Sequence, residues 1–398
     1  MIPLRAALIE FLRYHHYQGK GQWLDSYGAL ILSRGEVPRW VRLGEAAGIE
    51  SNIKLYQHLV RHNTGDDSLE RLLRELHHQL WVPLVSALPS HASQVILCPD
   101  AQLNLLSFAT LLDSSNRFLG EEYFVSYVSS GRDLLAETPP ASSSPELLVW
   151  ANPDFGTSSG GPLPVKPRIG DDSAASFREP RGLDFRPLPG AEQEGRWLYD
   201  HAKEIGFARS TLHVGQDATE TELIRVRAPQ AIHFATHGFL LPELDFASPP
   251  LGHAGRASGV RDTLLRASNP MLRSGLALAG ARHTLDAWSR GESIPANNDG
   301  IVTSEEIGCL NLHGTQLVVL SACDTGLGEP QTGEGVLGLR RGFIQAGAQN
   351  VLLTLWPIDD RQTAGFMPEL YTATHRIGSP AQALAEVQRS WLKKLRTQ

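Results

Sequence analysis

The chain has 398 residues, of which 41% are hydrophobic and 20% charged, proportions typical of a globular protein rather than a disordered one. Lys and Arg number 36 against 43 Asp and Glu, and the net charge of −7 argues against binding nucleic acid or an anionic membrane through bulk positive charge. The length allows two or three domains, or one large α/β unit with insertions.

Residues 1–150 are expected to form the N-terminal part of the fold, an antiparallel β-meander with helices. Apolar runs separated by Gly- and Pro-containing turns predict the strands, and Leu and Val at spacings of three and four residues predict the helices. The predicted strands cover 6–13, 27–34, 39–43, 93–97 and 146–151, and one or two helices lie within 55–80.

Residues 151–398 are expected to form the second part, which carries two insertions at 152–189 and 241–300. The first insertion is dense in Gly, Pro, Ser and charge, which predicts a mobile loop that a protease could cut. The second is irregular and contains one apolar segment, 275–280. Long irregular segments in compact domains are usually functional or disordered, so we expect at least one of them to cover or frame the functional site.

Outside the insertions, short apolar strands alternate with helices. This alternation predicts an α/β fold with a mostly parallel sheet covered by helices on both faces. The working residues of such sheets gather beyond the carboxyl ends of the strands, where this sequence has His237, Cys323 and the pair Asp359 and Asp360. The predicted strands cover 211–214, 231–236, 316–320 and 350–355, and the predicted helices cover 191–205, 219–222 (N-cap Thr219), 336–346, 361–374 and 380–395.

A cysteine and a histidine at two of these strand ends are the parts needed for acyl transfer. Cys323 precedes Asp-Thr-Gly-Leu-Gly after an apolar strand, and His237 is followed by Gly238. A thiolate nucleophile, an imidazole that protonates the leaving amine and backbone N–H groups for the oxyanion can together cleave an amide. Buried Cys and His at strand ends are also common without any catalytic role, so the pattern alone leaves both interpretations open.

The segments around both residues resemble the CHAT domain, a caspase- and separase-like cysteine peptidase domain often found behind tetratricopeptide repeats. The similarity lies in Ile-His-Phe-Ala-Thr-His-Gly-Phe at 232–239, Val-Val-Leu-Ser-Ala-Cys-Asp-Thr-Gly-Leu-Gly at 318–328 and Gly-Glu-Gly-Val-Leu-Gly-Leu at 333–339. Further similar blocks, in the expected order, cover 95–112, 187–192, 270–281 and 353–363.

The resemblance implies a caspase-like α/β fold in which residues 1–150 are a pseudo-peptidase-like half and residues 151–398 the catalytic half. It implies His237 and Cys323 as a catalytic dyad, with the N–H groups of Gly238 and Cys323 as the oxyanion hole. The implied activity is that of a cysteine endopeptidase on a protein substrate, in regulated or defence-type signalling. An activating sensor or repeat module would lie outside this chain, and the alternative is a non-catalytic CHAT-fold scaffold or interaction module.

Three aspartates are candidates for the pocket that holds the substrate residue before the cleaved bond. Asp324 follows the expected nucleophile, and Asp359 and Asp360 end the next strand. A carboxylate in this pocket would favour a basic substrate side chain. The alternative, that all three cap turns or helices, is equally open, and Asp360 would suit the N-cap of the helix from 361.

Other motif matches are interpreted as incidental. His233 lies four residues before His237, a metal-ligand spacing, but on a strand it is expected to pack inside the sheet. Residues 333–338 match G-x-G-x-x-G without directly following a strand, and no GxxxxGK[ST] sequence occurs. We therefore expect no cofactor and no metal.

The expected location is the cytoplasm. No run approaches the roughly 18 apolar residues of a membrane span, and Arg5 and Glu10 interrupt the N-terminal region where a signal peptide would lie. The three cysteines, Cys98, Cys309 and Cys323, form no C-x-x-C pair in a chain too long to need disulfides. We expect free thiols, and no partner of membrane or nucleic-acid type.

Overall fold

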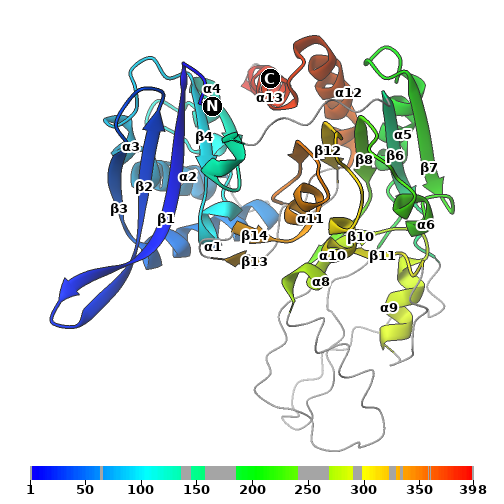
Figure 1. The fold of residues 1–398 in the computed structure, drawn as a ribbon, viewed down its shortest axis with the longest axis horizontal. Coiled ribbons are helices and arrows are strands. Elements are labelled where there is room, and N and C mark those ends of the chain that lie inside the picture. Colours follow the sequence, from blue (N-terminus) through cyan, green and yellow to red (C-terminus); the bar gives the residue numbers. More distant parts are fainter. Residues whose placement is uncertain are drawn as a thin grey trace, which may run out of the picture.

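Apolar runs in the sequence become the central strands of two separate five-stranded sheets, which lie on opposite sides of the molecule in Figure 1. The computed structural model describes residues 2–62, 66–135, 145–156, 185–240, 269–289, 298–321, 329–331, 335–356, 358 and 360–396.

The elements of the N-terminal part are β1 (Ala6–Gly19), β2 (Gln22–Ser33), β3 (Arg39–Glu45), α1 (Ala46–His62), α2 (Asp66–Leu80), α3 (Val82–Val85), β4 (Gln94–Cys98), η1 (Ala101–Leu105), η2 (Phe108–Thr110), α4 (Leu119–Glu122), β5 (Phe124–Tyr127) and η3 (Gly131–Leu135). Those that follow up to the small sheet are β6 (Glu146–Pro153), α5 (Pro189–Asp200), β7 (Arg209–Gly215), α6 (Glu220–Ile224), β8 (Ala231–Ala235), β9 (Gly238–Leu240), α8 (Pro270–Arg273), β10 (Ser274–Ala277), α9 (Ala281–Ser289) and β11 (Ile301–Thr303). The remaining elements are α10 (Ser304–Gly308), β12 (Leu317–Leu320), β13 (Glu329–Gln331), β14 (Gly335–Leu337), α11 (Leu339–Gln345), β15 (Val351–Leu352), α12 (Asp360–Ile377) and α13 (Pro380–Arg396).

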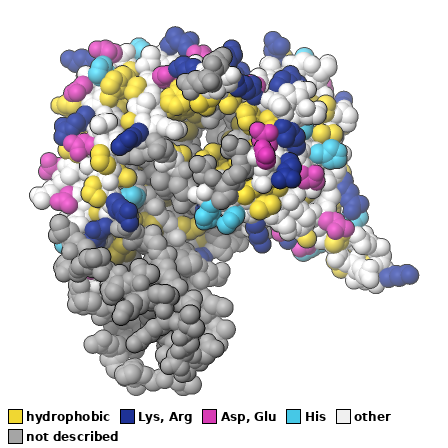
Figure 2. All heavy atoms as spheres, turned by 180° about the vertical axis from the view of Figure 1, so that it is seen from behind, with side chains coloured by type: hydrophobic (Ala, Val, Ile, Leu, Met, Phe, Trp, Pro, Cys, Tyr) yellow, Lys and Arg dark blue, Asp and Glu magenta, His cyan; other side chains and the backbone are white. Residues whose placement is uncertain are grey.

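The N-terminal sheet has the order β3-β2-β1-β4-β5 and contains the predicted meander. Strands β1, β2 and β3 pair antiparallel, while β4 pairs parallel to both β1 and β5, so the sheet is mixed. The β1–β2 hairpin is longer than predicted and extends as an arm from the body (Figures 1 and 2). The predicted helical region forms two helices, α1 and α2, which supply one wall of the main N-terminal core.

The second sheet has the order β15-β12-β8-β6-β7, and every strand pair in it is parallel. Alternate residues of β8 point to opposite faces, since Ala231 and Ala235 belong to one core and Ile232 and Phe234 to another. The first core is closed by α5, α12 and α13, and the second by α6, α10 and α11. The α/β class and the parallel sheet with helices on both faces are therefore confirmed.

Two smaller sheets correct the sequence predictions. Strands β11, β10 and β9 form an antiparallel sheet. Of these elements, β10 lies with α8 and α9 in the segment 241–300, which was predicted to be irregular apart from the apolar segment 275–280. The helix predicted from residue 336 begins at Leu339, because Gly335–Leu337 pairs as β14 with β13. Of the loop predicted at 152–189, residues 157–184 lie outside the described residues.

Helix termini follow the expected local chemistry in two places. Thr219 caps α6, since its side chain accepts a hydrogen bond from Glu222 N. Thr303 and Glu306 form a capping box at α10. Helix α12 begins at Asp360, so Asp360 occupies its first turn rather than the N-cap position that was predicted.

The two parts contact each other through the C-terminal helix and the β13–β14 hairpin. Helix α13 lies against α4 and β5, and Arg396 forms a bidentate ion pair with Glu121 at 2.6 and 2.9 Å. Arg389 Nε donates to Gly120 O over 2.7 Å. The hairpin lies against η1. The division near residue 150 stays a prediction, and β6, the first strand of the second sheet, spans it.

The described surface carries no broad region of one charge on the face shown in Figure 2, where basic and acidic side chains alternate. Within the described ranges, each helix is either too short or too polar to span a membrane.

Candidate active site

The backbone of His237 lies at the turn where the chain passes from the large sheet to the small one. Ala277 N donates to His237 O over 2.9 Å, and the side chain of the preceding Thr236 donates to Ala277 O over 2.5 Å. Strand β8 before the turn is wholly buried, and β9 after it pairs with β10. His237 is therefore held directly beyond the carboxyl end of β8.

The imidazole of His237 lies against two phenylalanine rings and a backbone carbonyl. Its centroid is 5.1 Å from the Phe155 ring and 5.6 Å from the Phe185 ring. Nε2 lies 2.8 Å from Arg186 O. A carbonyl oxygen only accepts hydrogen bonds, so Nε2 carries a proton, and Nδ1 is the basic nitrogen of the neutral ring. These contacts fix both the orientation and the tautomer of the imidazole.

Cys323 falls in 322–328, outside the described residues, but the strand that leads to it is fixed. Strand β12 pairs parallel with β8, and Leu320 is the partner of Phe234. Ser321 N donates to Phe234 O over 2.8 Å. Counted along the sequence, His237 lies three residues after Phe234 and Cys323 three residues after Leu320. In the sequence, the two candidate residues therefore follow neighbouring parallel strands by the same number of positions.

The other candidate residues are placed unevenly. Gly238 begins β9, where it is half-buried and opposite Leu276 of β10. Asp324 and Asp359 lie outside the described residues. Asp360 begins α12, which follows β15, the neighbour of β12. Gly238 thus lies beside His237, while the structure does not test the acidic pocket.

A buried polar cluster between the second sheet and helix α5 was not predicted from the sequence. His233, on β8, lies 2.6 Å from Glu194 of α5, and both are almost fully buried. Glu194 was detectable in principle, because it lies on the apolar side of the helix with Ala191, Gly195 and Leu198. A carboxylate at such a position must have a partner, and this is the signal that was missed.

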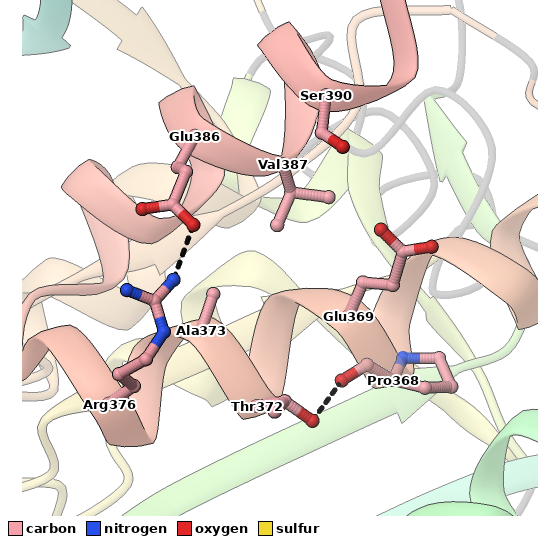
Figure 3. Close-up of a pocket in the computed structure, with 8 residues that line it drawn as sticks. All are labelled: Pro368, Glu369, Thr372, Ala373, Arg376, Glu386, Val387 and Ser390. Carbon is pink, nitrogen blue, oxygen red and sulfur yellow. Dashed lines mark hydrogen bonds and ion pairs between the residues drawn. The ribbon is translucent and has the colours of Figure 1, made fainter. Parts of the chain in front are cut away.

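No group of His, Cys, Asp or Glu side chains in the described part of the chain is arranged to hold a metal ion. His233 instead packs inside the sheet, as expected. A hollow of about 330 Å³ lies between α12 and α13, where the Arg376–Glu386 ion pair crosses its wall (Figure 3). A second, of about 340 Å³, lies beside Arg13. Among the described candidates, neither His237 nor Gly238 lines either hollow.

The burial of Cys98 separates it from any catalytic role. Burial is the main cause that raises the pKa of its thiol to about 12, with Glu10 adding a smaller effect. Sγ donates to Ser129 O over 3.2 Å. Cys309 is an exposed free thiol at the C-terminal end of α10. Neither thiol lies at the edge of the large sheet beside His237.

Comparison with known proteins gives one family and two distant relatives. The CHAT domain family matches residues 70–398. Human Tetratricopeptide repeat protein 28 is 27% identical over 330 residues, 80% of this chain, and the mouse protein of that name is 26% identical over 320 residues, 76% of this chain. The matched region is 12% of the length of either relative.

Among solved structures, the Arg-specific cysteine proteinase gingipain R (RgpB) aligns with a TM-score of 0.37 and 9% identity, covering 83% of this chain and 65% of that one. The family match extends over most of the chain, from α2 in the first part to the C-terminus, and includes both His237 and Cys323. The chain therefore belongs to the CHAT domain family.

Proposed function

We propose that this chain is a cysteine endopeptidase that cleaves a protein substrate with Cys323 as nucleophile and His237 as general acid and base. The observation that carries the proposal is the register of β8 and β12. These strands are adjacent and parallel, and His237 and Cys323 follow the paired residues Phe234 and Leu320 by the same number of positions. Catalytic groups of parallel sheets gather at such strand ends.

In the proposed reaction, the Cys323 thiolate attacks the carbonyl carbon of the scissile amide. The oxyanion that forms is held by the backbone N–H groups of Gly238 and Cys323. His237 gives a proton to the departing amine, and the C–N bond breaks to leave a thioester on Cys323. Water then attacks the thioester while His237 accepts its proton, and the C–S bond breaks to release the acid product and restore the Cys323 thiolate and the protonated His237.

The fixed imidazole supports this role. With Nε2 donating to Arg186 O, the proton exchanged with substrate is carried by Nδ1. Contact with Phe155 and Phe185 limits rotation of the ring. A general acid held in one orientation needs no reorganisation when the leaving amine forms.

The specificity proposal is that a carboxylate from Asp324, Asp359 or Asp360 binds a basic side chain before the cut. Support comes from the sequence order, in which these residues follow β12 and β15, two neighbouring strands. Bidentate pairing would favour Arg over Lys. A library digest in which cleavage follows uncharged residues would contradict the acidic pocket and leave the dyad unaffected.

The test of activity is a peptide-library digest with the wild type, Cys323→Ala and Cys309→Ala in parallel. Cys323→Ala should abolish turnover, while Cys309→Ala, at an exposed thiol on α10, should leave it unchanged. His237→Ala should lower kcat by about 10²–10⁴, the usual contribution of a positioned acid–base. Full turnover by Cys323→Ala would contradict the proposal, and no turnover by any variant would favour the non-catalytic scaffold.

The wider setting is proposed on similarity alone. The name of the human and mouse relatives refers to tetratricopeptide repeats, and this chain matches 12% of each. We propose that a repeat or sensor module regulates the peptidase and that its protein substrate belongs to regulated or defence-type signalling. Addition of a purified repeat module to the library digest, with turnover rates compared, is the direct test.

A further inference from the structure

Four polar side chains form a closed cluster between the second sheet and two of the helices that cover it. Glu194 comes from α5, His233 from β8, Ser321 from the residue after β12 and Tyr371 from α12. Their exposed fractions are 1%, 0%, 9% and 2%, so all four are shielded from bulk solvent. The helices and strands that carry them are neighbours in the same half of Figure 1.

A single carboxylate occupies the centre of this cluster. Glu194 Oε1 lies 2.6 Å from His233 Nε2, and Glu194 Oε2 accepts a hydrogen bond from Ser321 Oγ over 3.1 Å. This distance is that of an ion pair, but the geometry is not that of a hydrogen bond. Among the described residues, neither Glu194 Oε1 nor His233 Nε2 has a hydrogen-bond partner. Glu194 thus bridges two neighbouring strands with its two oxygens.

Tyr371 completes the cluster on the other side of the imidazole. Its hydroxyl lies 3.1 Å from His233 Nδ1, and burial, together with the charge of Glu194, raises its pKa well above 10. The hydroxyl therefore remains protonated and can donate to Nδ1, which leaves the proton of a neutral imidazole on Nε2, facing the carboxylate. Tyr371 and Ser321 are then the donors, to His233 Nδ1 and to Glu194 Oε2, and His233 Nε2 faces Glu194 Oε1.

The position of the cluster relates it to the candidate dyad. Ser321 precedes Cys323 by two residues, and His233 precedes His237 by four. A backbone hydrogen bond also links the ends of β12 and β8, since Ser321 N donates to Phe234 O. A buried carboxylate is costly to desolvate, and apolar side chains could fill this volume at no such cost. Buried polar groups of this kind are best attested where they fix register.

We propose that Glu194 is a positioning residue that fixes the end of β12 against β8 and so sets Cys323 relative to His237. Glu194 acts through Ser321 on one strand and through His233 on the other. The inference rests on the proposed peptidase function for its kinetic consequence, but the structural link between the two strand ends is independent of it.

The test compares two variants of the cluster with two matched controls in the full chain. Glu194→Gln removes the charge with little change of shape. Ser321→Ala removes only the hydrogen bond between Glu194 and the residue that follows β12. The controls, Glu50→Gln and Ser26→Ala, change a partly buried carboxylate and a fully buried serine in the N-terminal sheet and its helix. Each protein is assayed for thermal midpoint, for kcat and KM, and for alkylation of Cys323 relative to Cys309.

Glu194→Gln should lower kcat by about 10-fold to 100-fold with KM unchanged, because small misplacements of a reacting group have effects of this size. Ser321→Ala should lower kcat by a smaller factor, about fivefold. In both, alkylation of Cys323 relative to exposed Cys309 should slow, since Cys323 loses its alignment with the imidazole. Both controls should keep the wild-type kcat and alkylation ratio, whatever their thermal midpoints.

The outcomes separate this inference from the proposed function. If the wild type shows no peptidase activity, the proposed function fails, and the alkylation ratios alone decide whether the cluster positions Cys323. If the wild type is active but Glu194→Gln and Ser321→Ala retain its kcat and its alkylation ratio, the positioning role is refuted. A loss of kcat in the controls equal to that in the cluster variants would refute it as well, because the effect would then follow general stability.

Discussion

Glu220 gives a pH-dependent contribution to stability that can be worked out from its surroundings. This residue opens α6 and is 5% exposed. Burial is the largest cause that raises its pKa from 4.5 to about 7, and the charges of Asp299 and Glu306 add to the effect. Backbone hydrogen bonds from Asp299 and Gly300 oppose it. The folded chain therefore holds this proton at pH values where the unfolded chain has lost it.

Because the folded pKa exceeds the unfolded value, protonation of Glu220 favours the folded state below about pH 4.5 and this advantage disappears as the pH rises through about 7. A pKa difference of this size corresponds to an upper limit of about 3 kcal/mol in the free energy of unfolding. Glu220→Gln keeps an acceptor oxygen for the amides of Asp299 and Gly300 but cannot become charged. The stability of the variant should exceed that of the wild type least near pH 5 and by about 1–3 kcal/mol at pH 8.

The assay is urea unfolding followed by tryptophan fluorescence at several pH values between 5 and 8, with midpoints compared between proteins. Glu222→Gln is the control, because Glu222 lies on the same helix but is 39% exposed and pairs with Arg225. His77 and His213, whose pKa values are lowered chiefly by burial, titrate alike in the wild type and in Glu220→Gln and cancel in that comparison. In Glu222→Gln, His213 also loses the charge of Glu222, which opposes the effect of burial on its pKa. The reasoning is refuted if wild type and Glu220→Gln lose stability in parallel from pH 5 to pH 8.

Three further predictions concern packing, capping and thiol reactivity. Gly195→Ala should destabilise the fold by about 1–3 kcal/mol, since the added Cβ would lie 2.4 Å from Ala151 Cβ. Gly48→Ala, on α1, should not destabilise it, because the space there is open, and urea unfolding midpoints distinguish the two variants. Thr303→Ala should cost about 1 kcal/mol through loss of the cap of α10, and a midpoint equal to wild type would contradict this. Cys98 should react with iodoacetamide far more slowly in the native protein than in urea, because its thiol is buried. Equal rates in both would show that the thiol is accessible in the native protein.

The parallel sheet could be predicted from the sequence because its strands are short, continuous apolar runs. Leu317–Leu320 and Ala231–Ala235 are buried on both faces, and only a sheet covered on each side gives that pattern. The position of His237 after such a strand followed directly. The same logic applies to Thr219, whose capping role depends on residues adjacent in sequence.

The features that were missed depend on contacts between distant segments. The segment Gly335–Leu337 has an apolar pattern compatible with a helix, and only its pairing with Glu329–Gln331 makes it a strand. Likewise, β10 becomes a strand through partners on both sides. The cluster around Glu194 joins residues up to 177 positions apart, Glu194 and Tyr371, by way of His233. Local periodicity contains no signal for such pairings.

The contact between the two parts of the chain could not be predicted from local sequence pattern either. Substitution of Trp356 tests how much this contact contributes to stability. Trp356 follows β15, is partly buried, and packs against the N-terminal core, with its ring 6.2 Å from the ring of Tyr56 in an edge-to-face arrangement. Full burial of a tryptophan is worth about 3–5 kcal/mol on truncation to Ala, and partial burial lowers the expected loss to about 2 kcal/mol. Trp23→Ala is the matched control, because Trp23 is 64% exposed on the β1–β2 hairpin and its substitution should change stability by no more than about 0.5 kcal/mol.

Since Trp356 precedes Asp360 by four residues, Trp356→Ala should also loosen the start of α12, seen as faster hydrogen exchange in its first turns. Equal stability of the two variants, with unchanged exchange in α12, would show that the N-terminal core does not support this end of the second sheet.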